Sequence, residues 1–75
     1  MLTYTYGNRN EIESRFTYHE SDEDQQARYL FLRERAKELA HAICKYTPSS
    51  REQSLALTKL EESIMFANAA IARNE

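Results

Sequence analysis

Apolar positions recur at helical spacing in two long stretches of this 75-residue chain. In both stretches the spacing alternates between three and four positions, which is the pattern of an a/d seam. The first seam consists of Tyr29, Leu32, Ala36, Leu39, Ile43 and Tyr46, and the second of Leu57, Leu60, Ile64, Ala67 and Ile71. The pattern predicts two helices, each with one apolar stripe along its length.

Capping residues set the expected ends of the two helices. Ser21 precedes three acidic residues and is predicted to cap a helix that runs from about Asp22 to Tyr46. Pro48 ends that helix, because the residue before a proline avoids the helical region. Two frames fit a capping box for the second helix, namely Ser49 with Glu52 and Ser50 with Gln53. Since the connection is only a few residues long, we expect an antiparallel helical hairpin.

The first 20 residues differ from the rest of the chain. Residues 2–6 have a strand-like composition, residues 11–16 suit a short helix, and residues 16–19 suit an extended segment. We therefore predict an all-α fold of a single domain. It comprises a short N-terminal arm over residues 1–20 and a helical hairpin over residues 21–75.

The second helix is apolar almost all round toward its end. From Met65 to Ala72 the only polar side chain is Asn68. A surface helix normally has one apolar stripe and one wet face, so a helix without a wet face is expected to be buried on several sides. A chain this short has too little other protein to do that. We expect further copies of the chain to cover the helix in a homo-oligomeric helical bundle, with any ligand site shared between copies.

Composition narrows the classes of partner. The formal net charge of −2 argues against long DNA or RNA, which basic proteins bind, but not against a small anion. The single cysteine, Cys44, excludes an intrachain disulfide and is interpreted as a packing residue. No apolar run is long enough for a membrane span, and residues 1–6 do not resemble a signal peptide. We therefore expect a cytoplasmic protein without a membrane partner.

Catalytic and metal sites find little support in the residue pattern. Glu38 and His41 have the Glu-x-x-His spacing of carboxylate-bridged di-iron bundles, which Glu61 or Glu62 would complete. Such ligands must point inward, whereas the seam at Leu39 places Glu38 and His41 on the wet face. The sequence has no nucleophile at a spacing that would let a base activate it. It also has no glycine-rich loop of the kind that binds phosphate. We predict no enzyme activity, no cofactor and no metal.

Basic residues gather around the start of the first long helix. They are Arg28, Arg33, Arg35 and Lys37, with Arg15 and His19 shortly before them. Arginine forks match phosphate oxygens, and the rings of Tyr18 and Tyr29 are able to stack on nucleobases. On periodicity alone, the favoured interpretation is charged helix flanks around core tyrosines.

Two further residues each have two interpretations. Asn68 either fixes the register of packed subunits or faces a ligand, since a buried amide needs partners. Arg73 either complements the dipole of the last helical turn or contacts a ligand.

Several segments resemble a family of small phage and prophage proteins. The segments are Phe16-Thr17-Tyr18-His19, Gln26-x-Arg28-Tyr29-x-x-Leu32-Arg33, Ala36-Lys37-Glu38-Leu39-Ala40 and the stretch from Ser50 to Glu75. The family carries the hairpin domain shared by the anti-CBASS cyclic-oligonucleotide sponge and the anti-Thoeris sponge. The resemblance covers residues 16–75 and is most specific from Leu55 to Arg73. Residues 1–15 lie outside it.

The resemblance implies a function that composition does not reveal. Such sponges bind cyclic di- or trinucleotides, or cyclic ADP-ribose-type signals, without cleaving them, and so block activation of the host's immune effector. The family assembles as interlocked oligomers, often hexamers, with pockets between protomers. The resemblance therefore implies a homo-oligomer, with a hexamer expected, in the cytoplasm of the host bacterium.

The resemblance also suggests ligand-binding residues. Tyr18, with His19 beside it, corresponds to a tyrosine that stacks on a base, and Arg33 to a basic residue on the first long helix. Arg35 or Lys37 would assist Arg33 in neutralising phosphate.

A second type of family pocket uses an arginine of the last helix, where this chain has Asn68. Arg35 and Arg73 are candidates to replace that arginine, and Asn68 and Arg73 are expected to line a second surface related by symmetry.

The alternative function is a structural or protein-interaction hairpin with no small-molecule ligand, and a metal enzyme is a third possibility.

Overall fold

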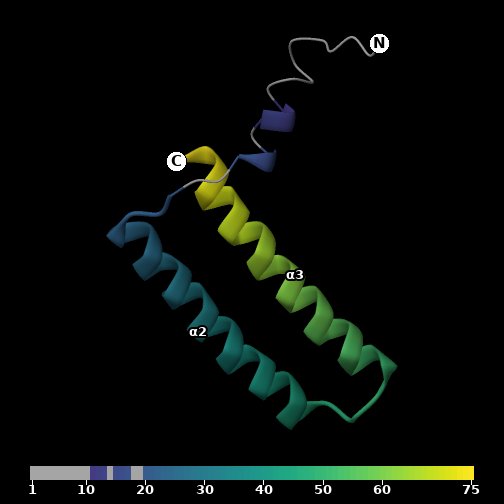
Figure 1. Cartoon of the computed structure of the whole chain (residues 1–75). Helices are drawn as coiled ribbons and strands as arrows, with labels where there is room; N and C mark the ends of the chain where they lie inside the picture. The colour runs from purple at the N-terminus through teal and green to yellow at the C-terminus, as the bar shows by residue number, and fades with distance from the viewer. Residues whose placement is uncertain (1–10, 14, 18–19) are drawn as a thin grey trace, which may run out of the picture.

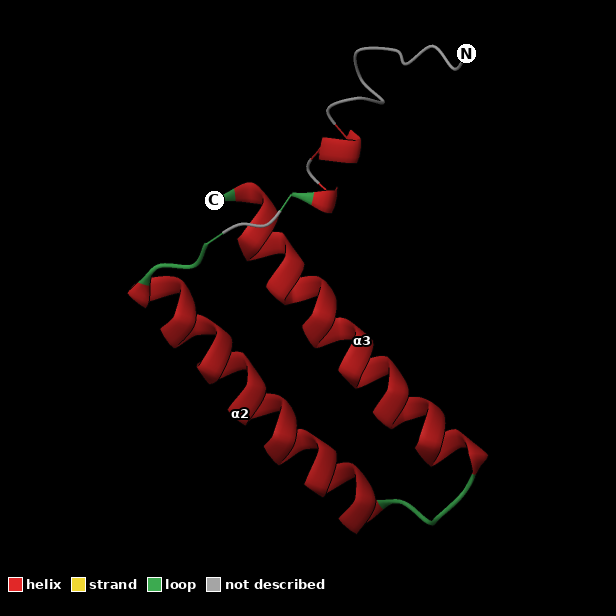
Figure 2. Ribbon diagram, viewed as in Figure 1, coloured by secondary structure: helices red, strands yellow, loops and turns green. Residues whose placement is uncertain are grey.

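A computed structural model describes residues 11–13, 15–17 and 20–75 of the chain. Two helices of 24 residues each, α2 (Glu23–Tyr46) and α3 (Arg51–Asn74), run antiparallel and side by side (Figures 1 and 2). Residues 11–13 and 15–16 are also helical, and no strand occurs in the described part of the chain. The predicted all-α helical hairpin is therefore confirmed. The strand-like segment at residues 2–6 lies outside the described residues.

The start of α2 differs from the prediction by one residue. The N-cap is Asp22 and not Ser21, because the Gln25 backbone N–H donates to Asp22 Oδ1 at 2.8 Å. The Asp22 N–H in turn donates to Gln25 Oε1 at 3.1 Å, which completes a capping box. Ser21 instead accepts hydrogen bonds from the Gln26 side-chain amide. An aspartate caps a helix as well as a serine does. The helix therefore begins after Asp22, the residue that forms both hydrogen bonds of the capping box with Gln25.

The connection between the helices is fastened by hydrogen bonds. Thr47 ends α2 in an extended conformation before Pro48, as expected for a residue that precedes proline. Ser50 caps α3 by accepting the Gln53 backbone N–H at 3.1 Å. The Gln53 side-chain amide donates to the carbonyl and hydroxyl oxygens of Thr47. Of the two predicted capping frames, the structure therefore uses the one at Ser50.

The expected extended segment at residues 16–19 is wrong at its first residue. Phe16 is helical, and the Thr17 N–H donates to the Glu13 carbonyl oxygen at 3.0 Å, as in a helical turn. Tyr18 and His19 lie outside the described residues.

The contact between the helices follows the predicted seam on α3 but departs from it on α2. All five predicted seam residues of α3 are half-buried. On α2, Leu39 and Tyr46 are exposed by 51% and 75%, and Ala40 is half-buried instead. An α-helix has 3.6 residues per turn, so a strict 3–4 repeat drifts around the helix along its length. Leu39 and Tyr46 have therefore turned away from α3, whereas Ile43 stays half-buried.

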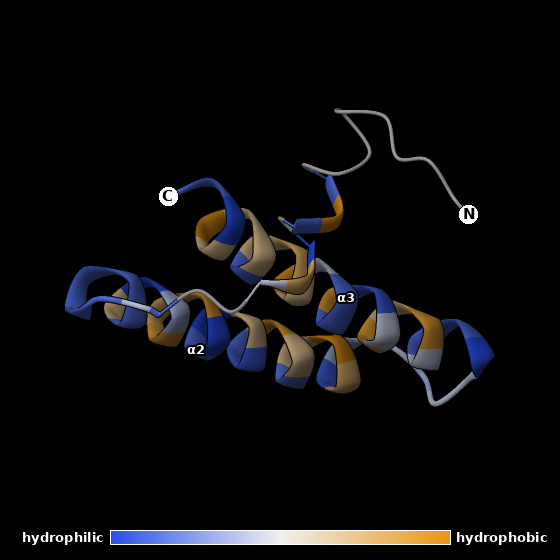
Figure 3. Cartoon of the chain, turned by 45° about the horizontal axis from the view of Figure 1, so that its top comes forward, coloured by the Kyte–Doolittle hydropathy of each residue, from blue (hydrophilic) through white to orange (hydrophobic). Residues whose placement is uncertain are grey.

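The hairpin has no enclosed core. None of the apolar side chains in the described part of the chain is buried, and large ones such as Phe16, Phe31, Met65 and Phe66 are more than 60% exposed. The molecule measures 52 × 34 × 13 Å, so its thinnest dimension is close to one helix diameter. Figure 3 shows apolar residues on several sides of the second half of α3. A single layer of two helices leaves this apolar surface in contact with water.

Neither α2 nor α3 has a stretch apolar enough to span a membrane, and the same holds for the rest of the described chain.

Candidate functional site

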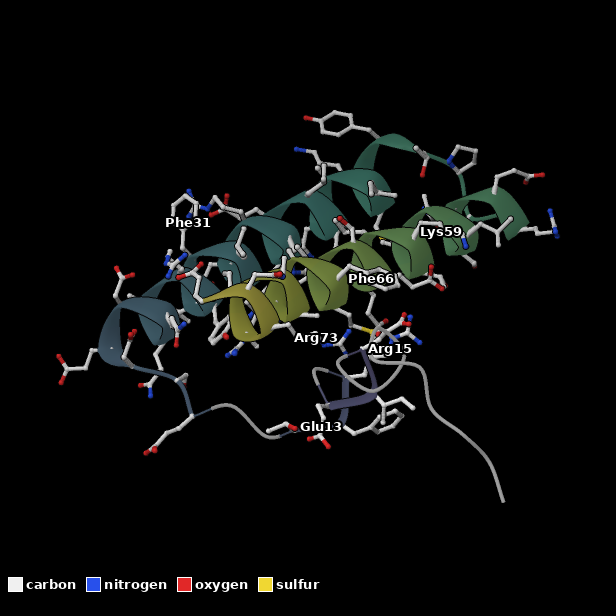
Figure 4. The ribbon with its side chains drawn as sticks, turned by 90° about the horizontal axis from the view of Figure 1, so that it is seen from above. Glu13, Arg15, Phe31, Lys59, Phe66 and Arg73 are labelled. Atoms are coloured by element: carbon white, nitrogen blue, oxygen red, sulfur yellow. The ribbon has the colours of Figure 1, made fainter. Side chains whose placement is uncertain are left out.

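A hollow of about 460 Å³ lies where the arm meets the open end of the hairpin. It is lined by Arg15 and Thr17 from the arm, by Tyr29 and Arg33 from α2, and by Asn68, Ala69, Ala72 and Arg73 from α3. In Figure 4, Arg15 and Arg73 lie on the same side of α3. The small side chains of Ala69 and Ala72 leave room between three guanidinium groups. This hollow is called the arginine hollow below.

A second hollow, of about 350 Å³, continues along the groove between α2 and α3. Its wall is mainly apolar, with three charged side chains and one amide: Arg33, Ala36, Lys37, Ala40, Leu57, Leu60, Glu61, Ile64, Met65 and Asn68. Arg33 and Asn68 border both hollows. This second space is called the groove hollow below.

The cations that line the two hollows differ in whether they have acidic partners. Arg33, Lys37 and Arg73 form no ion pair within the described residues, whereas Arg15 pairs with Glu11 at 2.7 Å. The arginine hollow has three guanidinium groups and no carboxylate among its lining residues, while the groove hollow contains Glu61. Unneutralised guanidinium groups that converge on one space favour a bound anion, and their planar forks suit phosphate.

Asn68 lies between the two hollows and has an unsatisfied group. Its side-chain oxygen Oδ1 is buried and accepts no hydrogen bond from the described residues. Leaving a buried acceptor unpaired costs about 1–3 kcal/mol, so such groups in folded proteins usually have a partner. The amide is therefore a candidate contact for a ligand or for another subunit, which are the two roles considered from the sequence.

The structure brings together four of the seven residues predicted to bind a ligand. Arg33 and Asn68 line both hollows, Lys37 lines the groove hollow and Arg73 lines the arginine hollow. Their roles in binding stay predictions.

The other three predicted residues are not part of this arrangement. Arg35 lines neither hollow, because its guanidinium donates to Glu38 at 2.9 Å and lies 5.3 Å from the centroid of the Phe31 ring. In Figure 4, Phe31 lies on the side of α2 that is turned away from Arg73. Tyr18 and His19 lie outside the described residues.

Besides Ala69 and Ala72, three residues of the arginine hollow were not among the predicted ligand-binding residues: Arg15, Thr17 and Tyr29. The sequence is compatible with Tyr29 as a core residue or as a stacking ring, and in the structure it is half-buried at the wall of the hollow. Arg15 and Thr17 line the hollow because the described segment at residues 15–17 lies beside the end of α3. Helical spacing gives no information on that long-range placement, although Arg15 was visible as part of the basic cluster.

An ion pair joins the two helices at the open end of the hairpin. The Arg28 guanidinium donates to both carboxylate oxygens of Glu75, at 2.8 and 2.5 Å, and also pairs with Asp24 on its own helix. These hydrogen bonds, which Arg28 donates and Glu75 accepts, lower the pKa of the Glu75 carboxyl and raise the pKa of Arg28. Arg28 is thus engaged in holding the helix ends together and does not line either hollow.

The chemistry of the arginine hollow suits binding. Its lining side chains include no carboxylate, imidazole or thiol that could act as a general base or a metal ligand. Within residues 11–13, 15–17 and 20–75, no cluster of three or more His, Cys, Asp or Glu side chains is placed to hold a metal ion. Glu38 of the di-iron hypothesis is paired with Arg35, and His41 is exposed.

Comparison with known proteins identifies the family. Residues 8–72 match the family model described as "Acb2/Tad1, hairpin domain". The match begins earlier than the predicted resemblance, so part of the arm that was expected to lie outside the family belongs to the matched segment. No curated protein and no solved structure matches the chain. Because the matched segment covers well over half of the sequence, the chain belongs to the Acb2/Tad1 hairpin-domain family.

Proposed function

We propose that this protein is a phage anti-defence sponge that binds a cyclic nucleotide signal and withholds it, unaltered, from the host's immune effector. The observation that carries the proposal is the arginine hollow, in which Arg33 and Arg73 lack acidic partners among the described residues and Tyr29 presents an aromatic ring. Membership of the Acb2/Tad1 hairpin-domain family supports it independently.

Phosphate recognition is assigned to the arginine hollow in this proposal. Guanidinium forks form paired, charge-assisted hydrogen bonds with phosphate oxygens. The groove hollow is less suited to an anion, because Glu61 shares its wall with Lys37 and would repel a phosphate placed beside it. We therefore assign Arg33 and Arg73 to the phosphates and Lys37 to a weaker, longer-range attraction.

Base recognition is assigned to aromatic and amide groups. Tyr29, at the wall of the arginine hollow, is placed to stack on a nucleobase, a contact worth about 1–3 kcal/mol per base in other proteins. Tyr18 is proposed for the same role from its position in the sequence, with His19 beside it. The unpaired Asn68 amide is able to hydrogen-bond to a base edge, since it offers both a donor and an acceptor.

Assembly is part of the same proposal. The lack of buried apolar side chains in the described part of the chain supports burial of α3 against further copies, and we propose a hexamer. Cyclic dinucleotides, cyclic trinucleotides and cyclic ADP-ribose-type molecules are the candidate ligands. We propose action in the bacterial cytoplasm, where these signals are produced, and no catalytic turnover.

Isothermal titration calorimetry with these three ligand classes tests the proposal. The expected result is binding of at least one class, followed by recovery of the ligand chemically intact. Replacement of Arg33 by Gln is expected to weaken binding about tenfold or more, since hydrogen bonds to charged groups contribute about 1.5–3 kcal/mol. Arg51→Gln is the matched control, because Arg51 is an exposed arginine at the opposite end of the hairpin.

Two results would contradict the proposal. A folded, assembled protein that binds none of the three ligand classes is not a sponge for these signals. The alternative of a protein-interaction module would then be favoured, and exposed rings such as Phe31 and Phe66 would be candidate contacts. A ligand recovered in altered form would indicate an enzyme.

A further inference from the structure

Arg15 of the arm stands apart from the other two arginines of the arginine hollow because it already has a partner. Its guanidinium forms an ion pair with Glu11 at 2.7 Å, one helical turn earlier, and both side chains are more than half exposed. Exposed pairs at this spacing contribute only about 0.2–0.5 kcal/mol. The pair is thus weak enough for Arg15 to exchange Glu11 for a stronger anionic partner.

An anion bound in the arginine hollow would be such a partner, because Arg15 lines that hollow. Arg15 lines the same space as Arg33 and Arg73, and these three residues belong to three different segments of the chain. No carboxylate lies among the lining residues, and within the described part of the chain only Arg15 of the three arginines has an acidic partner, Glu11, which lies outside the lining. A phosphate would neutralise them and accept hydrogen bonds from more than one guanidinium fork.

We infer that Arg15 is a ligand residue that the arm contributes to the hollow, and that it exchanges its ion pair with Glu11 for a phosphate of the bound cyclic nucleotide. The inference rests on the proposed function and adds to it. The arm, and not only the hairpin, then forms part of the binding site. Glu11 becomes an internal competitor of the ligand, and its removal strengthens binding.

A set of variants separates this role from a structural one. Arg15→Gln removes the fork and its charge, Glu11→Gln removes only the competitor, and both break the same ion pair. Titration of cyclic di-AMP into the full chain is expected to show about tenfold weaker binding for Arg15→Gln. Glu11→Gln is expected to bind about twofold more tightly than the original chain.

Further variants complete the test. Arg15→Lys keeps the charge but loses the fork, so its affinity is expected to fall between those of the original chain and Arg15→Gln. The double variant Glu11→Gln/Arg15→Gln is expected to match Arg15→Gln, because a competitor without its arginine has no effect. Cyclic tri-AMP and cyclic ADP-ribose serve as the probes if cyclic di-AMP gives no heat.

The outcomes separate failure of this inference from failure of the proposed function. If Arg15→Gln binds as tightly as the original chain, or if both single variants weaken binding equally, Arg15 has no ligand contact and the inference is overturned. In those cases the original chain still binds the ligand, and the proposed function is not contradicted. If the original chain binds none of the three probes, both the inference and the proposed function are overturned.

Discussion

The side-chain oxygen of Asn68 is buried without a hydrogen-bond donor among the described residues, on a stretch of α3 that is otherwise apolar. The sequence identified Asn68 as unusual because it is the single polar residue between Met65 and Ala72. Only the structure shows that it borders two hollows at once. Its two possible partners, a ligand and another subunit, make opposite predictions for the ligand-free protein.

Replacement of Asn68 by Leu is expected to raise the melting temperature of the ligand-free protein by several degrees. An unpaired buried acceptor costs about 1–3 kcal/mol of stability, and leucine, which is close to asparagine in size, has no such acceptor. Scanning calorimetry of both proteins under identical conditions measures the effect. A lower melting temperature for Asn68→Leu would show that the amide is already bonded across a subunit contact.

At the scale of the helices, the caps and ends were largely predictable because local signals determine them. Pro48 ended α2 as expected, and Ser50 was one of two capping residues that the sequence left open. The α2 seam was less predictable at Leu39 and Tyr46, because the true helical period departs from a strict 3–4 repeat. The position of Arg15 was not predictable at all, because it depends on where residues 15–17 lie relative to α3.

The choice between the two capping frames of α3 leads to a prediction. Ser50→Ala is expected to lower the free energy of unfolding by about 1 kcal/mol, because the Gln53 backbone N–H loses its acceptor. Ser49→Ala is the matched control and is expected to have little effect. Thermal denaturation followed by circular dichroism measures both. Equal losses in the two variants would contradict the assignment of Ser50 as the cap.

The ion pair between Arg28 and Glu75 makes the open end of the hairpin sensitive to pH. The pKa of Glu75 is lowered from its ordinary value of 4.5 by the hydrogen bonds from Arg28. A carboxyl whose pKa falls on folding contributes stability above its unfolded pKa, and the contribution is lost as the pH falls through the lower folded pKa. Both groups are exposed to solvent, so the contribution is small and screened by salt.

Glu75→Gln is therefore expected to speed amide hydrogen exchange in the last turn of α3 at neutral pH. The difference from the original chain is expected to shrink as the pH falls below 4.5. Glu62→Gln is the control, because it removes an exposed ion pair within α3 and leaves the contact between the helix ends intact. A difference that persists unchanged at low pH would exclude the ion pair as its source.

At the scale of the whole molecule, the exposed side chains of α3 lead to a prediction about assembly. Phe66 is 73% exposed in the hairpin, and burial of such a ring contributes about 1.5–3 kcal/mol. Phe66→Glu is expected to shift the protein toward single chains in analytical ultracentrifugation. Thr58→Glu adds the same charge at an exposed position of the same helix and is expected to leave the assembly intact. A folded single chain at micromolar concentration without any substitution would contradict the proposed oligomer.

The 13 Å thickness of the hairpin has a consequence for how the protein denatures. The described part of a single chain encloses no apolar side chain, so in the proposed oligomer little would hold the two helices together once neighbouring copies leave. If the proposed oligomer forms, folding and association are one reaction, and its equilibrium follows mass action. Dilution alone should unfold this protein, and its thermal transition should move upward each time more chain is added to the same buffer.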